Sequence, residues 1–204
     1  MLYERYPALI ECRAEIEKAK GIIIDTYKKG GKLLICGNGG SCADSGHIVG
    51  ELMKGFLSKR PVSEELYEKI KNVAPEDADY FKDNLQGSLP AIALDSQNAL
   101  ITAFMNDVQP DLIYAQAVLG YGKKEDLFMG LSTSGNSKNV VHGAKIAKAL
   151  GLATIALTGE KESKLSEICD VCIKVPETET YKVQEYHLPV YHYLCEEVEK
   201  YFFG

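Results

Sequence analysis

The sequence lacks a long apolar run, a surplus of positive charge and a dinucleotide fingerprint, and each absence excludes a class of protein. A membrane-spanning helix needs about 18 consecutive apolar residues, and a signal peptide needs a shorter apolar segment near its start. Neither is present, so we expect a cytoplasmic protein with no membrane partner. Lysine and arginine number 23 against 29 aspartates and glutamates, and no basic stripe is present to bind nucleic acid. The absence of a G-x-G-x-x-G motif disfavours a dinucleotide cofactor.

Paired cysteines of the kind that bind zinc or form disulfide frameworks are also lacking. The six cysteines lie at positions 12, 36, 42, 169, 172 and 195. Only Cys169 and Cys172 have C-x-x-C spacing, and they fall in an expected strand, where residues three apart point to opposite faces. No second C-x-x-C completes a site. We therefore expect all six to be reduced, mostly buried apolar residues.

The 204 residues suffice for one domain of ordinary size. Short apolar segments typical of buried strands alternate along the chain with helical patterns. The expected strands cover residues 32–36, 91–94, 126–131, 152–157 and 171–175. The expected helices cover residues 4–29, 42–54, 98–105, 110–119, 137–150, 163–168 and 181–202. This alternation predicts an α/β fold with a doubly wound, parallel five-stranded sheet and flanking helices on both faces.

One segment, residues 61–88, does not fit the alternation. It is polar, contains Pro61 and Pro75, and shows two short helical patterns but no strand. We therefore expect a single domain over residues 1–204 with a helical insertion at residues 61–88. Strand order cannot be deduced from the sequence. Ligands of doubly wound sheets bind at the carboxyl ends of the strands, where two loops rich in glycine and serine are expected here.

The second of these loops, Ser132–Ser137, reads Ser-Thr-Ser-Gly-Asn-Ser between an expected strand and an expected helix. Backbone N–H groups at a helix start, together with hydroxyl groups, favour an anion, and small residues let it approach the backbone closely. An ordinary helix N-cap needs only one such side chain. The surplus predicts a binding site for a phosphorylated small molecule. Ser134 lacks the preceding glycine of a nucleophile elbow, which disfavours a hydrolase.

Three of the four histidines fall in two of the expected helices. His47 and Glu51 are four residues apart and share one helix face, within reach of a common metal ion or proton, although surface pairs often have the same spacing. The last helix holds Gln184, His187 and His192. By spacing alone, either histidine is as good a partner for Gln184 as the other. The spacing therefore leaves that choice open.

Four motifs in this order resemble those of a known family. They are Cys36-Gly-Asn-Gly-Gly-Ser41, His47-x3-Glu51, Leu131-Ser-Thr-Ser-Gly-Asn-Ser137 and Val183-Gln-Glu-x-His187-x4-His192. Taken together they resemble the sugar isomerase (SIS) domain family, and within it the phosphoheptose isomerase branch. The resemblance covers nearly the whole chain except residues 61–88. It implies an isomerase that interconverts sedoheptulose 7-phosphate and D-glycero-D-manno-heptose 7-phosphate.

The resemblance also implies roles for individual residues. It implies a zinc ion (Zn2+) held by His47, Glu51, Gln184 and His192. It implies a substrate phosphate bound by Ser132, Thr133, Ser134 and Ser137, in a pocket completed by Asn38, Gly39, Gly40, Ser41 and Gln184. Glu51 and His192 would be the acid/base pair that moves a proton between C1 and C2 through an enediol. Family members are homotetramers with active sites at subunit contacts, and the same is implied here.

Three positions depart from the branch. Gln97, Gly55 and Tyr181 stand where an Asp, an Arg and an acidic residue are expected, so the substrate contacts are less well defined than the metal and phosphate residues. One alternative is a non-enzymatic SIS protein, either a sugar-phosphate sensor or a scaffold that binds a replication initiator. Another is a metal-free isomerase or amino-sugar deaminase acting on a hexose phosphate. The retained zinc-type residues favour the enzyme, because a scaffold has no chemical need of them.

Overall fold

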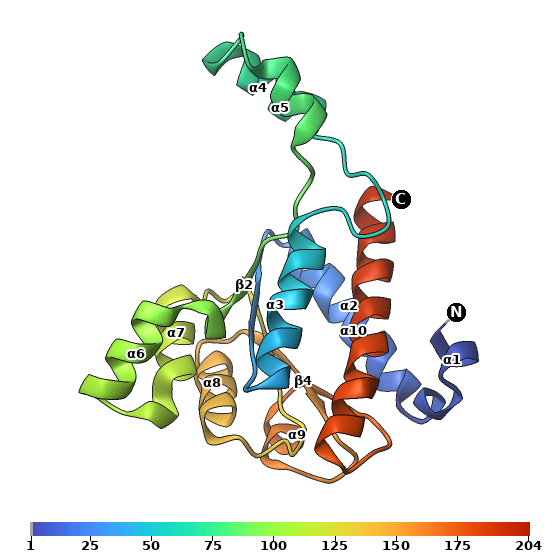
Figure 1. Cartoon of the computed structure of the whole chain (residues 1–204), viewed down its shortest axis with the longest axis vertical. Coiled ribbons are helices and arrows are strands. Elements are labelled where there is room, and N and C mark those ends of the chain that lie inside the picture. The colour runs from blue at the N-terminus through green and yellow to red at the C-terminus, as the bar shows by residue number, and fades with distance from the viewer. Residues whose placement is uncertain (1) are drawn as a thin grey trace.

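The computed structural model describes residues 2–204 and contains a parallel sheet of five strands in the order β2-β1-β3-β4-β5 (Figure 1). The strands are β1 (Leu33–Cys36), β2 (Ala91–Ala93), β3 (Leu127–Leu131), β4 (Ala153–Thr158) and β5 (Val171–Lys174). Each lies within one residue of its predicted bounds. The prediction of a doubly wound parallel sheet is confirmed, and the strand order, which the sequence left open, is now defined.

Helices cover both faces of the sheet. They are α1 (Leu2–Arg5), α2 (Arg13–Lys28), α3 (Gly40–Met53), α4 (Glu64–Val73), α5 (Ala78–Asn84), α6 (Asn98–Asp107), α7 (Ile113–Tyr121), α8 (Lys138–Ala149), α9 (Lys164–Ile168) and α10 (Thr180–Phe203). Three 3-10 segments join them, η1 (Pro7–Cys12), η2 (Leu94–Ser96) and η3 (Pro110–Leu112). No helix of residues 2–204 has the length and apolarity to cross a membrane.

The first predicted helix, over residues 4–29, is wrong in part, because the chain divides there into α1, η1 and α2. The break falls at Tyr6, whose φ of −132° and ψ of 73° lie outside the helical region. Pro7 explains it, since a proline disfavours the helical conformation in the residue before it. In the last helix, by contrast, α10 continues through Pro189 without interruption.

The core consists of two apolar layers, one on each face of the sheet. Along β3, Leu127, Met129 and Leu131 face a layer formed with α2, α3 and α10, whereas Phe128 faces a layer formed with α7 and α8. Because both faces are covered, the central strands are apolar throughout.

The sheet reverses its order of growth between β1 and β3. The chain runs from β1 outward to β2, and then returns to β3 and continues outward to β4 and β5. A crevice forms at such a reversal, outside the carboxyl ends of the two strands. The loops 37–41 and 132–137 follow β1 and β3, so the fold brings both to this crevice.

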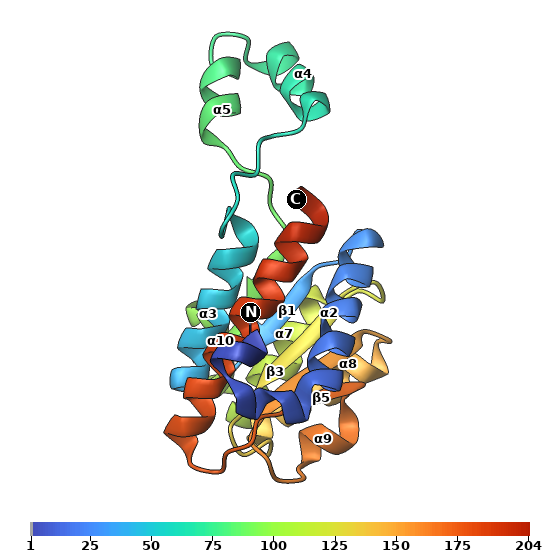
Figure 2. The same ribbon diagram turned by 90° about the vertical axis from the view of Figure 1, so that its right-hand side faces the viewer.

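The insertion forms a helical hairpin that stands away from the sheet (Figures 1 and 2). Its helices α4 and α5 pack on each other, and the Tyr67 hydroxyl donates to Asp79 Oδ1 at 2.5 Å. The Ser63 hydroxyl accepts a hydrogen bond from the Leu66 N–H and so caps α4. The chain reaches the hairpin and returns from it through two extended segments, which run beside the carboxyl end of α10 (Figure 2).

Candidate active site

The loop after β1 is held tightly on both sides. Gly39 has a φ of +57°, which favours glycine, and it is the N-cap of α3. A Cβ at Gly40 would lie 2.6 Å from Gln184 Nε2, so the amide of Gln184 packs directly against this backbone. The Tyr114 hydroxyl donates to the Gly37 carbonyl at 2.6 Å. These contacts restrict the conformation of the loop. Asn38 is exposed at one end of it, and Ser41 is buried at the other.

The loop after β3 forms a turn with several hydroxyl groups at the start of α8. Ser132 Oγ and Ser137 Oγ are 3.0 Å apart, and the Asn136 N–H donates to Ser134 Oγ at 3.2 Å. Ser137 stands at the N-cap of α8 without a side-chain capping bond. Ser132 is buried, Thr133 and Ser137 are half-buried, and Ser134 is exposed. The hydroxyls and the open helix start lie together, as an anion site requires.

The two loops are joined by a pair of amides. Asn38 Nδ2 donates to Asn139 Oδ1, and Asn139 Nδ2 donates to Asn38 Oδ1, both at 2.9 Å. Asn139 belongs to the first turn of α8. The glycine loop and the hydroxyl loop therefore form one continuous rim at the crevice.

A second group of polar side chains lies where α3 packs beside α10. His47 Nε2 and Glu51 Oε1 are 3.1 Å apart, as the predicted four-residue spacing allows. The His47 ring meets the His192 ring edge-on with centroids 5.1 Å apart, and its Nδ1 lies 2.9 Å from the Tyr191 hydroxyl. The Phe56 ring lies 5.6 Å from the His192 ring.

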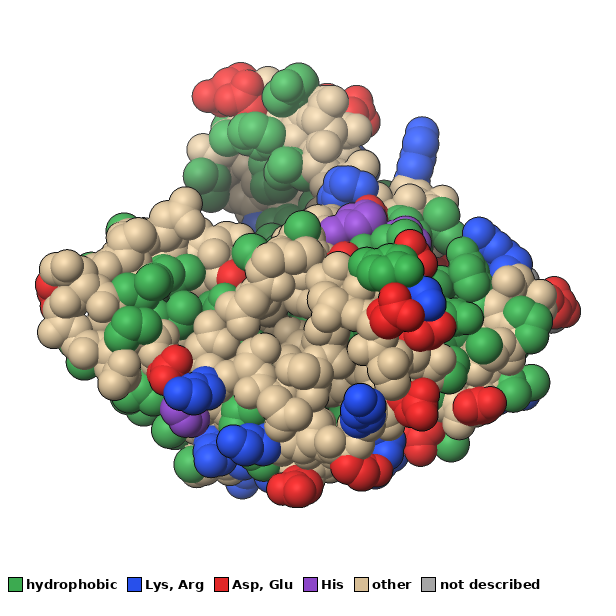
Figure 3. Space-filling model, turned by 60° about the horizontal axis from the view of Figure 1, so that its bottom comes forward, with side chains coloured by type: hydrophobic (Ala, Val, Ile, Leu, Met, Phe, Trp, Pro, Cys, Tyr) green, Lys and Arg blue, Asp and Glu red, His purple; other side chains and the backbone are tan. Residues whose placement is uncertain are grey.

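Two atoms of this group are buried without hydrogen bonds, Glu51 Oε2 and His192 Nε2, and Lys54 Nζ lies 3.6 Å from Glu51 Oε2 as an ion-pair partner. Buried polar atoms without hydrogen bonds are costly, so both atoms are available to a further ligand. Burial, and then the neighbouring His47, lower the pKa of His192. A hollow of 510 Å³ adjoins His192 on its open side, and its lining includes Arg5 and Tyr193. Figure 3 shows histidine side chains, in purple, at the surface beside apolar and acidic side chains.

The other histidines lie elsewhere. His187 is wholly buried, its Nε2 lies 3.3 Å from the Thr158 carbonyl, and burial lowers its pKa to about 4. The structure therefore places His192, and not His187, beside His47. His142 Nδ1 lies 3.0 Å from the Asp111 carbonyl, outside both groups.

Gln184 lies apart from the histidine–glutamate group. It packs against Gly40, and from Gly40 to His47 the helix α3 rises about 10 Å. Within residues 2–204, no three histidine, cysteine, aspartate or glutamate side chains are already arranged to hold a metal ion. The structure thus brings together three of the four implied zinc ligands, and the fourth lies at the glycine loop.

Sequence reasoning missed Asp95. Its Oδ2 accepts hydrogen bonds from the Gly37 N–H at 2.9 Å and the Ser45 hydroxyl at 2.5 Å, whereas its Oδ1 is buried without a partner. Burial raises the pKa of this carboxyl group. Asp95 directly follows the predicted strand 91–94, and an acidic residue at that point was the only available signal. The prediction considered Gln97 instead, and the Gln97 side chain accepts from the Tyr121 hydroxyl at 3.3 Å.

Comparison with known proteins gives a consistent result. The SIS domain family matches the chain over residues 86–192, and a second match to an SIS domain covers residues 8–83. A phosphoheptose isomerase of Akkermansia muciniphila is 34% identical over 201 residues, which are 98% of this chain and 93% of that protein. A phosphoheptose isomerase of Rhodospirillum rubrum is 36% identical, covering 93% of this chain and 87% of that protein.

Solved structures resemble the fold as a whole. A phosphoheptose isomerase from Francisella tularensis has a TM-score of 0.77 at 28% identity, covering 95% of this chain and 92% of the other. One from Neisseria gonorrhoeae has a TM-score of 0.71 at 28% identity, covering 98% of this chain and all of the other. The similarity thus extends over the sheet, both loops and the helix pair α3–α10.

Proposed function

This chain belongs to the SIS domain family, and within it to the phosphoheptose isomerases, and on that premise we propose that it converts sedoheptulose 7-phosphate into D-glycero-D-manno-heptose 7-phosphate with the help of zinc. The broader activity, isomerisation of a phosphosugar, follows from membership of the phosphoheptose isomerases. The observation that supports the finer proposal is the pair of buried atoms without hydrogen bonds, Glu51 Oε2 and His192 Nε2, beside His47.

The reaction moves a proton between C1 and C2 of the sugar through an enediol, so one group must take a proton from carbon and another must serve the oxygens. Glu51 and His192 supply a carboxylate and an imidazole for these roles. They stand on different helices, α3 and α10, so the fold can hold them on two sides of the reacting carbons. The Phe56 ring packs against His192 and shields it from solvent on that side.

The substrate phosphate is assigned to the Ser132–Ser137 loop, with Asn38, Gly39, Gly40 and Ser41 completing the pocket. Hydroxyl groups and the start of α8 attract an anion without a basic side chain, which suits this acidic chain. Binding energy gained at the phosphate, away from the reacting carbons, can position the substrate for proton transfer.

Zinc fits the residues present, because histidine nitrogens and a glutamate oxygen are its usual ligands. His47, Glu51 and His192 would hold it, and the ion would bind the two buried atoms that lack hydrogen bonds. When bound, zinc polarises the substrate carbonyl and stabilises the negative charge that develops on the enediolate oxygens. Gln184, the fourth ligand that the resemblance implies, lies against Gly40, and its place in the set stays a prediction.

We also propose that the protein is a cytoplasmic homotetramer. The hollow beside His192, lined in part by Arg5, Tyr6 and Pro189, leaves the active site open on one side. A neighbouring subunit seated there would close it. Sedimentation of the purified protein at several concentrations tests the assembly directly.

The first test is zinc content per subunit together with turnover of sedoheptulose 7-phosphate, before and after chelation. We expect about one zinc per subunit and turnover that chelation abolishes and zinc restores. His192→Ala should lose both, whereas His142→Ala, a histidine outside the site, should keep both. Turnover that survives chelation would refute the zinc proposal. Zinc without turnover of this sugar would refute the substrate assignment.

A further inference from the structure

Glu199, close to the end of α10, carries a buried carboxylate with an unusual set of donors. Its Oε1 accepts from the Phe56 N–H at 2.7 Å, and its Oε2 accepts from the Leu57 and Ser58 N–H groups at 2.8 and 3.1 Å. Arg60 Nε donates to Oε1 at 2.8 Å. Burial alone would raise the pKa of Glu199, but the hydrogen bonds from backbone N–H groups and Arg60 hold it below its ordinary value. The carboxylate therefore stays charged and fixes three successive backbone groups.

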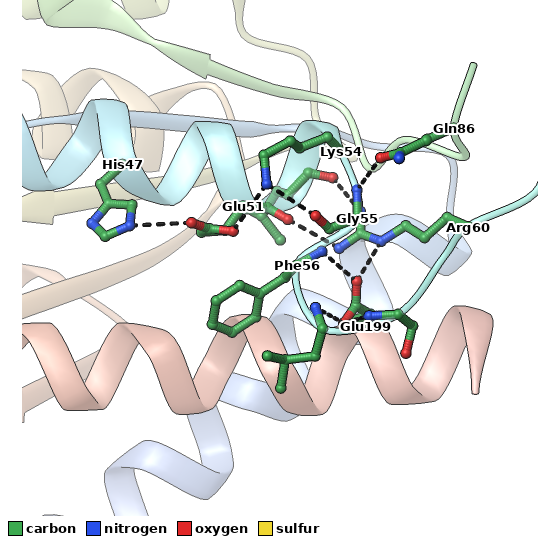
Figure 4. Close-up of polar contacts among 11 residues, drawn as sticks. His47, Glu51, Lys54, Gly55, Phe56, Arg60, Gln86 and Glu199 are labelled. Atoms are coloured by element: carbon green, nitrogen blue, oxygen red, sulfur yellow. Dashed lines mark hydrogen bonds and ion pairs between the residues drawn. The ribbon is translucent and has the colours of Figure 1, made fainter. Parts of the chain in front are cut away.

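Arg60 makes its other hydrogen bonds to the helix that carries Glu51. Its Nη1 donates to the Leu52 carbonyl at 2.6 Å, and its Nη2 donates to the Glu51 carbonyl at 3.0 Å (Figure 4). These carbonyls lie in the last turn of α3, where no further backbone N–H groups of the helix can reach them. Arg60 therefore caps α3 immediately after Glu51.

Both members of the pair are almost wholly buried, with 0% of the Arg60 side chain and 1% of the Glu199 side chain exposed. A buried ion pair is weak evidence for stability, because desolvation of the two charges offsets much of their attraction, and apolar replacements are often as stable. Stability alone therefore does not account for this pair. Beyond the bond that joins them, the hydrogen bonds of the two side chains all go to two segments that border the active site, the end of α3 and residues 56–58.

We propose that Arg60 and Glu199 are positioning residues for the isomerase reaction, an inference that rests on the proposed function. Arg60 fixes the last helical turn and with it the carboxylate of Glu51. Glu199 fixes the backbone of residues 56–58 and with it the Phe56 ring, which lies against His192. The pair thus fixes the position of Glu51 on α3 relative to His192 on α10.

The test is the double variant Arg60→Met/Glu199→Met, which removes both charges and keeps apolar volume at the site. We expect it to fold, and we expect kcat to fall by about 10- to 100-fold, since small displacements of catalytic groups have effects of that size. KM should stay within about twofold of the wild-type value, because the phosphate loop makes no contact with the pair. Arg60→Lys, which keeps the charge but loses the forked donors, should have an intermediate kcat.

A matched control pair joins the residues that precede β1 and β3, at the amino ends of those strands. Lys32 and Asp126 form a partly buried ion pair, and the Asp126 carboxylate also accepts from the Lys32 and Lys123 backbone N–H groups. Lys32→Met/Asp126→Met removes the same chemistry from a pair whose hydrogen bonds go to neither the end of α3 nor residues 56–58. It should change stability and leave kcat within about twofold of wild type.

Wild-type turnover of sedoheptulose 7-phosphate is measured first, because its absence would refute the proposed function rather than the positioning role alone. With an active wild type, a folded Arg60→Met/Glu199→Met protein that keeps its kcat would overturn the inference. So would an equal loss of kcat in the control pair. If the double variant does not fold, the nearly isosteric Glu199→Gln replaces it, and a wild-type kcat in that protein would overturn the inference equally.

Discussion

Gly135 lies in the hydroxyl loop, and its replacement by alanine should damage both folding and substrate binding. Its φ is +65°, and a Cβ added there would lie under 3.0 Å from the Oγ and Cβ of Ser163, closer than real Cβ atoms approach other atoms. Ser163 cannot simply move aside, because it caps α9 with a capping box. The substitution should therefore lower the free energy of unfolding in two ways, through backbone strain and through overpacking.

The two penalties can be estimated separately. A left-handed backbone costs an alanine about 1–2 kcal/mol. Overpacking adds about 1–3 kcal/mol, for a total of about 2–5 kcal/mol. For a chain of this size each kcal/mol lowers Tm by about 2–4 °C, so we expect Tm to fall by about 4–20 °C. KM for the phosphosugar should rise as well, because the loop that binds phosphate must shift away from Ser163 to make room for the added Cβ.

Gly151→Ala separates the two contributions. Gly151 has a φ of +80°, but the nearest atom to its added Cβ is Lys124 Cγ at 3.7 Å, an ordinary contact. This variant should therefore lose only the backbone contribution of about 1–2 kcal/mol and keep its KM. Thermal unfolding and steady-state kinetics of both variants give the comparison. Equal Tm losses in the two variants, or an unchanged KM in Gly135→Ala, would refute the reasoning.

Three further predictions follow. Glu51→Gln should abolish turnover while circular dichroism and Tm stay close to wild type; substantial activity would exclude Glu51 as the acid/base group. Ser134→Ala should mainly weaken binding of the phosphosugar, measured by calorimetry, and an unchanged affinity would contradict the phosphate assignment. His187 has its pKa lowered by burial from 6.5 to about 4, so the unfolded chain binds the proton first as the pH falls. Stability should be unaffected above about pH 6.5 and should decline by about 3 kcal/mol as the pH drops from there to about 4. Urea unfolding over this range checks the slope, which His187→Gln should reduce; an identical slope in that variant would rule out His187 as its source.

Much of the fold was predictable because the sheet is covered on both faces. Strands such as β3 are therefore continuous apolar runs that end abruptly in glycine or serine, and their bounds follow from composition. The contact between His47 and Glu51 was also predictable, since it depends only on helical spacing within α3. The error at Tyr6 came from giving apolar spacing more weight than the local effect of Pro7.

What could not be predicted are contacts between elements. Arg60 and Glu199 are 139 residues apart, and nothing in either local sequence indicates that they meet. The choice between His187 and His192 likewise depended on how α10 is rotated against α3 and β4, which helical spacing leaves undefined. Asp95 was missed for the same reason, because its role appears only when the Gly37 N–H is seen to donate to it.

The hairpin leaves and re-enters the body of the protein at adjacent points. The Gly87 N–H donates to the Arg60 carbonyl at 2.7 Å, so the two ends of the segment 61–86 are already closed against each other. A loop whose ends meet in this way can change greatly in length at little entropic cost, because closure depends only weakly on length. The strands of the sheet need not move when the length of this segment changes. The same junction is therefore a suitable place to graft a whole foreign domain, or to replace α4 and α5 by a tight turn, with the catalytic body left as it is.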